Sequence, residues 1–368
     1  MKYYIIAGEA SGDLHGASLI KEIKLLDKQA DFRCWGGNLM NKEGAYIVKH
    51  YRDISFMGFW EVFKNMTSII NNLKFCKRDI KIYNPHYIIY IDYPGFNLRI
   101  AKWAKKKGFK NHYYISPQVW AWKENRVSTI RHSVDKLYVI LPFEKIFFDK
   151  NHKYSVDYVG HPLLEQIPKW KKDLNFLKNN HLSKRKKIIA LMPGSRKQEI
   201  NKILPEFIKA KLEFPEFQFV IAGSPGRSKS DYNFISKKIK VPIIFGKTYD
   251  LLQYSHAALV ASGTATLEAA LFGVPQIVCY KSNFLNYIIA KFIVKLKFIS
   301  LVNLIMDKEI VKELIQNKCN SKNIVLYLKR LLSNSEIKNV KNNYKKLNKL
   351  LDKGGASKIV ANLILKES

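Results

Sequence analysis

The chain has 368 residues, of which 47% are hydrophobic, and its formal net charge is +33 at pH 7. This length exceeds the size at which single hydrophobic cores stop growing, so we expect two domains. The apolar content excludes a disordered chain. The charge predicts anionic partners: nucleic acid, phosphorylated substrates or an acidic lipid leaflet. Because Lys and Asn are abundant along the whole chain, charge alone does not choose among these partners.

The cysteines and apolar segments indicate a reducing compartment and no membrane span. Cysteine occurs at four widely spaced positions without a C-x-x-C pair, which argues against a zinc site and a disulfide framework. The N-terminal apolar run ends at Ala7 in a glycine turn, so we expect no signal peptide. Three lysines interrupt the most apolar long segment, residues 284–305. We therefore expect a protein that is soluble or lies on a membrane surface.

Residues 2–7 predict a buried strand that runs into the turn GEASGDLHGA and then into a helical pattern through Leu26. A strand, a glycine turn and a helix start offer backbone N–H groups and a helix dipole to an anion. The glycine spacing is not G-x-G-x-x-G, so a dinucleotide fingerprint is not supported. The turn either forms a ligand site or simply allows a tight connection. Its candidate ligand-binding residues are Gly8, Glu9, Ser11, Gly12, Asp13 and His15.

A second apolar strand, residues 88–91, runs into Asp92, and Pro94 and Gly95 then turn the chain. Ligands of open α/β sheets bind beyond the carboxyl ends of the strands. A single carboxylate at such a strand end is placed for chemistry, and we predict that Asp92 is a general base. The alternative is that Asp92 caps the helix that begins near Phe96.

The first half continues as strands alternating with helices. Strands are expected at residues 31–37, 112–116, 136–141 and 156–159, which predicts a doubly wound parallel sheet. An aromatic loop, QVWAWK, follows the second of these strands and carries Trp120 and Trp122, and the stretch after it, from Arg126 to His132, is basic.

The alternation restarts after a polar stretch rich in Lys and Asn, which we interpret as a linker. Strands are expected at residues 187–192, 218–222, 242–245, 258–260 and 276–280. We therefore predict an α/β fold of two Rossmann-like, doubly wound parallel-sheet domains facing a cleft. The expected division is residues 1–168, a linker at 169–186, a second domain at 187–345 and a helical tail at 346–368.

Two glycine turns in the second half follow strands and open helices, at residues 193–196 and 262–266. Both would aim backbone N–H groups at one strand-end crevice, where the Arg196 guanidinium suits phosphate oxygens. Glu268, one turn into the second helix, would reach a ribose diol. Together these features predict a nucleotide-diphosphate site. No P-loop motif occurs, which argues against an NTPase, and no D-x-D motif occurs, so we expect no metal.

Residues 54–75 carry more apolar side chains than one helical face holds, and cations flank or interrupt them. Such a helix either packs in the core, lies in a bilayer interface or lines a pocket for acyl chains. The residues that would contact membrane or acyl chains are Phe56, Met57, Phe59, Trp60, Phe63, Met66, Ile69 and Ile70.

Nine stretches occur in the order and spacing of one enzyme family: GEASGDLHGA, MGFWEV, IDYPGFN, SPQVWAWK, LPFE, VGHPL, MPGSR, ASGTATLE and SLVNLI…KELIQ. On these stretches the chain resembles the lipid-A-disaccharide synthases, GT-B glycosyltransferases of Gram-negative outer-membrane assembly. The resemblance implies transfer of 2,3-diacylglucosamine from its UDP conjugate to the 6-hydroxyl of 2,3-diacylglucosamine 1-phosphate. It implies no cofactor, and it places the protein in the cytoplasm, peripheral on the cytoplasmic face of the inner membrane. An anionic membrane surface and a homodimer through the C-terminal region are the other implied partners.

The resemblance also carries roles to individual residues. It makes Asp92 the base and assigns the N-terminal motif, from Gly8 to His15, to the acceptor. Two positions depart from the family pattern, because His86 and Gly95 stand where acids are common. The residues that match UDP-sugar-binding motifs are Gly194, Ser195, Arg196, Ser262, Gly263, Thr264, Ala265, Thr266, Glu268, Asn303 and Glu313.

Two alternatives remain, one a different enzyme and the other a protein of another class. Another UDP-sugar GT-B transferase or a UDP-sugar epimerase would share the scaffold, although an epimerase needs no apolar, cationic surface beside its site. A basic nucleic-acid-binding protein is the other alternative. The paired α/β halves argue against it, as do the absence of an aromatic RNP motif and of a concentrated basic recognition helix.

Overall fold

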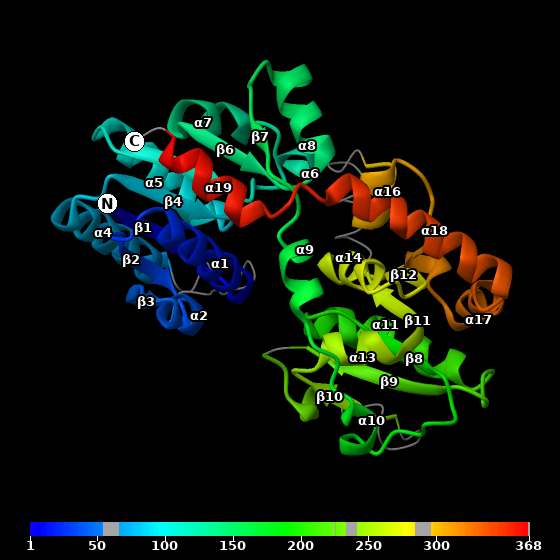
Figure 1. The fold of residues 1–368 in the computed structure, drawn as a ribbon. Coiled ribbons are helices and arrows are strands. Elements are labelled where there is room, and N and C mark those ends of the chain that lie inside the picture. The colour runs from blue at the N-terminus through cyan, green and yellow to red at the C-terminus, as the bar shows by residue number, and fades with distance from the viewer. Residues whose placement is uncertain (54–65, 225, 233–240, 284–295, 367–368) are drawn as a thin grey trace. The chain divides into compact units, whose positions relative to one another are not determined.

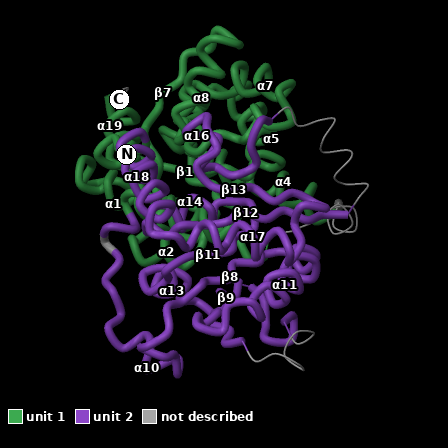
Figure 2. The backbone as a smooth tube through the Cα atoms, turned by 90° about the vertical axis from the view of Figure 1, so that its right-hand side faces the viewer, with its two compact units in different colours: residues 1–165, 351–368 green, residues 166–350 purple. Residues whose placement is uncertain are grey.

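The computed structural model describes residues 1–53, 66–224, 226–232, 241–283 and 296–366 (Figure 1). The chain forms two compact units, one of residues 1–165 and 351–368 and the other of residues 166–350 (Figure 2). The stretch expected as a linker, residues 169–186, lies in the second unit. The end of the chain, expected as a separate tail, returns to the first unit.

Unit 1 is built on a parallel sheet of seven strands in the order β3-β2-β1-β4-β5-β6-β7. Its central strands are buried on both faces, as parallel strands covered by helices are. The strands are β1 (Lys2–Ala7), β2 (Asp31–Gly36), β3 (Tyr46–His50), β4 (Tyr87–Ile91), β5 (Lys110–Tyr114), β6 (Lys136–Val139) and β7 (Asp157–Tyr158).

The helices that the structure describes in unit 1 lie between these strands or follow the last of them. They are α1 (Ala10–Leu26), α2 (Asn38–Lys42), η1 (Tyr51–Asp53), α4 (Met66–Tyr83), α5 (Pro94–Lys106), α6 (Val119–Trp122), α7 (Arg126–Ser133), α8 (Pro142–Ile146), η2 (Phe147–Asn151), α9 (Leu163–Gln166) and α19 (Ala356–Leu365). The last of them, α19, lies beside α1 (Figure 1) and contributes Val360, Ala361 and Ile364 to the same buried cluster as Leu19 and Ile20. Burial of this apolar face explains why the C-terminal helix belongs to unit 1.

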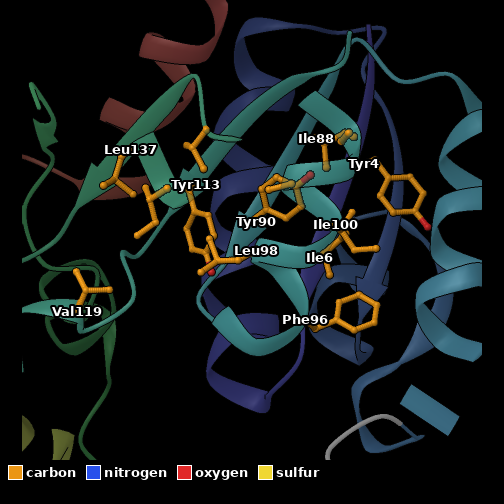
Figure 3. Packing of buried hydrophobic residues seen from close by; sticks show 14 of the residues in the cluster. Tyr4, Ile6, Ile88, Tyr90, Phe96, Leu98, Ile100, Tyr113, Val119 and Leu137 are labelled. Atoms are coloured by element: carbon orange, nitrogen blue, oxygen red, sulfur yellow. The ribbon is translucent and has the colours of Figure 1, made fainter. Parts of the chain in front are cut away.

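The core of unit 1 lies on both faces of its sheet. Side chains at alternate positions of a strand point to opposite faces, and on one face Ile6, Ile88 and Tyr90 pack against Phe96 and Ile100 of α5 (Figure 3). The order of the sheet reverses between β1 and β4, so the carboxyl ends of these two strands form the switch point at which doubly wound sheets bind ligands.

Unit 2 repeats the pattern with six parallel strands in the order β10-β9-β8-β11-β12-β13. Its switch point lies between β8 and β11. The strands are β8 (Ile188–Met192), β9 (Gln218–Gly223), β10 (Ile243–Phe245), β11 (Ser255–Ala261), β12 (Gln276–Tyr280) and β13 (Lys312–Ile315). The helices are η3 (Ile167–Lys169), α10 (Phe176–Asn179), α11 (Lys197–Lys211), η4 (Lys229–Tyr232), α13 (Thr248–Tyr254), α14 (Thr264–Leu271), α16 (Leu301–Met306), η5 (Gln316–Lys318), α17 (Ser321–Leu331) and α18 (Asn334–Leu351).

The two parallel α/β sheets confirm the predicted fold class. Two edge strands, β3 and β13, were not predicted from the sequence. Among the residues that the structure describes, no helix is long and apolar enough to span a membrane.

Candidate functional site

The switch point of unit 1 brings Asp92 beside the N-terminal motif. Ala7 at the end of β1 is paired with Ile91 at the end of β4, so Glu9 and Asp92 follow neighbouring strand ends. The approach between the two connections is close, because a Cβ on Gly8 would lie 2.4 Å from the ring of Tyr93. A side chain at position 8 would therefore force the turn that carries Asp92 to move.

The backbone at Asp92 has an unusual conformation. Asp92 and Tyr93 are consecutive residues with φ of 45° and 49°, in the left-handed region that side chains other than glycine rarely adopt. The Asp92 carbonyl accepts hydrogen bonds from the Tyr113 hydroxyl at 2.6 Å and from Asn97 Nδ2 at 2.7 Å. Both donors are fully buried. The Asp92 N–H donates to the Tyr114 carbonyl at 3.2 Å. Strain of this kind persists only where the surroundings fix it, as at functional sites.

The alternative role for Asp92, a helix cap, is wrong. The N-cap of α5 is Tyr93, and no described side chain caps the first turn. The left-handed residues let α5 begin at Pro94, earlier than the sequence pattern indicates, and Asp92 stays outside the helix with an exposed side chain.

The pKa of Asp92 is raised from 3.8 to about 6. Although the residue reaches solvent, desolvation by the atoms crowded around the carboxylate is the largest cause, and the nearby charge of Glu9 adds to it. The Tyr93 N–H donates to the carboxylate and opposes the rise. A carboxylate with this pKa is mostly ionised at pH 7, and its basicity is high enough for it to accept a proton.

The N-terminal motif divides into two groups of residues. Glu9 and Ser11 are exposed beside Asp92. Asp13 is buried, and its carboxylate accepts the N–H groups of Gly37 at 2.8 Å, Leu39 at 3.0 Å and Met40 at 3.1 Å. These bonds fix the start of α2, so the expectation that Asp13 contacts an acceptor is not supported. Gly12 is also buried and His15 is half-buried. Burial lowers the His15 pKa to about 4.

A buried acid that was not predicted from the sequence supports the aromatic loop. Glu144 of α8 accepts the indole N–H of Trp120 at 3.0 Å and the N–H groups of Ile140 and Leu141 at 3.1 and 3.0 Å. Burial raises the pKa of Glu144 to about 7. Glu144 belongs to the LPFE stretch noted in the sequence. Only the fold shows that it accepts a hydrogen bond from the loop after β5 and so supports that loop.

Unit 2 contains a cavity of about 410 Å³ at its switch point. The turn after β8 and the turn after β11 both line it, as the sequence predicts. Thr248, Ser224 and Tyr280 also line it and were not predicted. The predicted residues in its wall are Gly194, Ser195, Arg196, Ser262, Gly263, Thr264, Ala265 and Glu268.

The turn after β8 depends on glycine. Gly194 has φ of 102°, and a Cβ there would lie 2.4 Å from Glu199 Oε2. The guanidinium of Arg227, another residue that the sequence analysis missed, donates through Nε to the Ser195 carbonyl at 2.9 Å. Arg196 follows at the N-cap of α11 with 78% of its side chain exposed, and among the described residues its guanidinium makes one long ion-pair contact, 3.7 Å to Glu199. Its charge is therefore available to an anion in the cavity.

Glu268 faces the cavity from α14 and is oriented by Tyr249, whose hydroxyl donates to Glu268 Oε1 at 3.1 Å. Burial raises the Glu268 pKa and the tyrosine bond opposes the rise. A carboxylate held in this way can accept hydrogen bonds from a pair of hydroxyl groups. Thr266 is buried and bonds the Gly263 carbonyl at 2.8 Å, so it shapes the turn.

Asn303 and Glu313 lie outside the cavity wall. Asn303 donates to Glu313 at 2.8 Å, and Glu313 in turn accepts the N–H groups of Ile299 at 2.9 Å and Ser300 at 3.0 Å. The Ile299 carbonyl accepts the Ser262 hydroxyl at 2.7 Å. The two residues therefore support the turn that lines the cavity.

Most of the predicted membrane-contacting residues, Phe56, Met57, Phe59, Trp60 and Phe63, lie outside the described residues. The structure places Met66 at the start of α4, and on the same helix Ile69 is half-buried and Ile70 is 45% exposed.

The two departures from the family pattern lie where they leave Asp92 undisturbed. His86 precedes β4 and accepts the Lys2 N–H, at the opposite edge of the sheet from Asp92. Gly95 is exposed in the first turn of α5, where an added Cβ would meet nothing within 4 Å. In the part of the chain that the structure describes, no group of His, Cys, Asp and Glu is arranged to hold a metal ion.

Comparisons with known proteins agree with this geometry. The family model described as Lipid-A-disaccharide synthetase matches residues 3–364. A lipid-A-disaccharide synthase 1 of Legionella pneumophila (strain Lens) is 36% identical over 90% of this chain and 88% of its own length. A lipid-A-disaccharide synthase of Coxiella burnetii (strain CbuG_Q212) is 35% identical over 98% of this chain and 96% of its own length.

The chain belongs to the lipid-A-disaccharide synthase family. It is therefore an enzyme, a GT-B glycosyltransferase of lipid A synthesis. Solved structures support the fold at low sequence identity. UDP-GlcNAc 2-epimerase of Neisseria meningitidis superimposes with a TM-score of 0.72 at 14% identity and full coverage of both chains. The glycosyltransferase of kitacinnamycin has a TM-score of 0.65 at 10% identity and covers 100% of this chain and 98% of its own.

Proposed function

We propose that this synthase moves 2,3-diacylglucosamine from UDP-2,3-diacylglucosamine to the 6-hydroxyl of 2,3-diacylglucosamine 1-phosphate. The products are the β-1,6-linked lipid A disaccharide 1-phosphate and UDP. The observation that carries the proposal is the pair of switch points. The switch point of unit 1 bears Asp92, which is exposed, has a strained backbone and has a raised pKa. The switch point of unit 2 bears a cavity lined by two turns rich in N–H groups and by the exposed Arg196.

Asp92 acts as the general base in this proposal. It accepts the proton of the acceptor 6-hydroxyl as that oxygen bonds to the donor's anomeric carbon. The bond from this carbon to the phosphate oxygen breaks, UDP leaves with the electron pair, and the anomeric centre inverts. General-base assistance contributes roughly 10²–10⁴-fold to the rate, and positioning of the two sugars supplies a further part.

The unit 2 cavity binds UDP in this proposal. The N–H groups of the turns at Gly194 and Gly263 and the charge of Arg196 stabilise the diphosphate as it leaves. Glu268, held by Tyr249, accepts the ribose hydroxyls. The cavity of about 410 Å³ lies within the range of small-molecule sites. Among solved structures with this fold, UDP-GlcNAc 2-epimerase of Neisseria meningitidis was crystallised with UDP-GlcNAc bound.

The lipid substrates place the enzyme at a membrane surface in this proposal. The net charge of +33 favours the anionic cytoplasmic face of the inner membrane. The exposed Ile70, Phe75 and Ile82 of α4 support contact with acyl chains or lipid, and Arg78 lies 5.8 Å from the Phe75 ring centroid.

Mass spectrometry of the product tests the proposal. Purified enzyme is incubated with both diacylated precursors in detergent, and we expect the mass of the disaccharide 1-phosphate together with stoichiometric UDP. An epimerised UDP-sugar formed without the acceptor would instead support the epimerase alternative. UDP release without a disaccharide would contradict the assigned acceptor.

A further inference from the structure

A compact group of one aromatic and two cationic side chains lies at the end of the aromatic loop of unit 1. Trp122 ends α6 and is 51% exposed. Lys123 Nζ lies 4.2 Å from the Trp122 ring centroid, and Arg126 Cζ lies 5.8 Å from it. We name these three residues the Trp122 cluster. Cation–π attraction holds the two cations close to the exposed ring.

The two cations of the Trp122 cluster are not neutralised. Within the described ranges, neither Lys123 nor Arg126 has a carboxylate at ion-pair distance. Glu124 lies between them in sequence, but its Oε1 is 3.1 Å from His152 Nε2. The Lys123 pKa is lowered, first by burial and then by the charge of Arg126. Two half-buried cations near one ring, with no described carboxylate beside them, suit a doubly charged anion.

The Trp122 cluster lies on the same edge of the sheet as Asp92. The loop that carries it leaves the carboxyl end of β5, which is paired with β4 along its length. Tyr113 of β5, the strand that precedes the loop of the Trp122 cluster, also contacts Asp92, because its hydroxyl donates to the Asp92 carbonyl. Burial raises the Tyr113 pKa and Asp92 adds to the rise, whereas the charge of Arg126 opposes it. The charges of Arg126 and Asp92 therefore both influence the pKa of the Tyr113 hydroxyl.

We propose that the Trp122 cluster is the subsite for the phosphate monoester of the acceptor. This inference rests on the proposed function. Lys123 and Arg126 bind the phosphate oxygens, and Trp122 packs its ring against the adjoining sugar. A phosphate monoester carries a charge of about −1.5 to −2 at neutral pH, which matches the two unpaired cations. The subsite thus selects an acceptor that carries the phosphate and anchors it beside the base.

Equilibrium binding tests this inference independently of turnover. Isothermal titration calorimetry in detergent with saturating UDP compares 2,3-diacylglucosamine 1-phosphate with 2,3-diacylglucosamine, which lacks the phosphate. The test variant is Lys123→Gln/Arg126→Gln. The matched control is Lys102→Gln/Lys106→Gln, which removes two exposed charges from α5 of the same unit. Circular dichroism and the melting temperature report whether each variant folds.

We expect the wild type and the control to prefer the phosphorylated acceptor. The test variant should bind this acceptor about 10–100-fold more weakly, because it loses charge-assisted hydrogen bonds, and should bind the phosphate-free one unchanged. A test variant that keeps the wild-type preference would overturn the subsite.

Three other outcomes separate this inference from its alternatives. If the test variant binds the acceptor normally but loses co-sedimentation with phosphatidylglycerol vesicles, the Trp122 cluster contacts the membrane and the subsite is refuted. If the wild type binds both acceptors equally, the subsite fails while the proposed function stands. If the wild type binds neither, the proposed function fails and the subsite fails with it.

Discussion

Replacing Glu9 should shift the pH dependence of the transfer reaction. The Asp92 pKa is raised from 3.8 to about 6, with desolvation as the larger cause and Glu9 as the second. A base works only when ionised, so activity falls as pH drops through the pKa. At a pKa of 6, about 90% of the enzyme carries ionised Asp92 at pH 7 and about 10% at pH 5. Glu9→Gln removes the like charge, so the pH at which activity falls on the acidic side of the profile (the acidic limb) should move below 6. The Asp92 pKa should stay above 3.8, because desolvation persists.

The assay is kcat/KM as a function of pH, which reports the pKa of the free enzyme. The position of the limb is informative even if Glu9→Gln also weakens acceptor binding and lowers the plateau. Glu22→Gln, at the far end of α1, removes the same charge and should leave the limb in place. An unmoved or raised limb in Glu9→Gln would refute the electrostatic link between the two carboxylates.

Three further substitutions probe separate parts of the account. Arg196→Ala should weaken UDP binding by about 10–100-fold in calorimetry, because a charge-assisted contact is lost; unchanged affinity would refute its role. Asn97→Ala removes a donor to the Asp92 carbonyl and should lower kcat by about 10–100-fold with the KM for the UDP-sugar unchanged; an unaltered kcat would show that this bond does not position the base. Asp79→Ala removes the buried partner of Arg33 and should lower the free energy of unfolding by about 3 kcal/mol in urea titration. The control is Asp307→Ala, which removes the exposed ion pair between Lys297 and Asp307. It should lower the free energy of unfolding by less than about 1 kcal/mol.

The sequence predicted the central strands well, and the reason is physical. Parallel strands covered on both faces, such as β1, β4 and β8, are continuous apolar runs. The edge strands β3 and β13 are only partly buried, and their mixed composition did not reveal them. The docking of α19 on unit 1 depends on contacts more than 300 residues apart, which no local pattern encodes.

The candidate site was predictable only in part. Turns after strands have a local signature, so the residues at Asp92 and at the unit 2 cavity were found. Whether a polar side chain faces a ligand depends on long-range partners. The Asp13 carboxylate accepts hydrogen bonds from N–H groups 24–27 residues away. The Glu144 carboxylate accepts one from the Trp120 indole, 24 residues away. Within the described part of the chain Arg126 has no carboxylate partner, because Glu124 contacts His152 instead, and sequence spacing does not show this.

Asp92→Asn decides whether this carboxylate is the base. The substitution keeps the size of the side chain but removes its basicity. Single-turnover measurement of disaccharide formation, paired with calorimetry of UDP binding, separates chemistry from binding. The account predicts a rate lower by roughly 10²–10⁴-fold with UDP affinity retained. A wild-type rate in Asp92→Asn would contradict the assignment of the base.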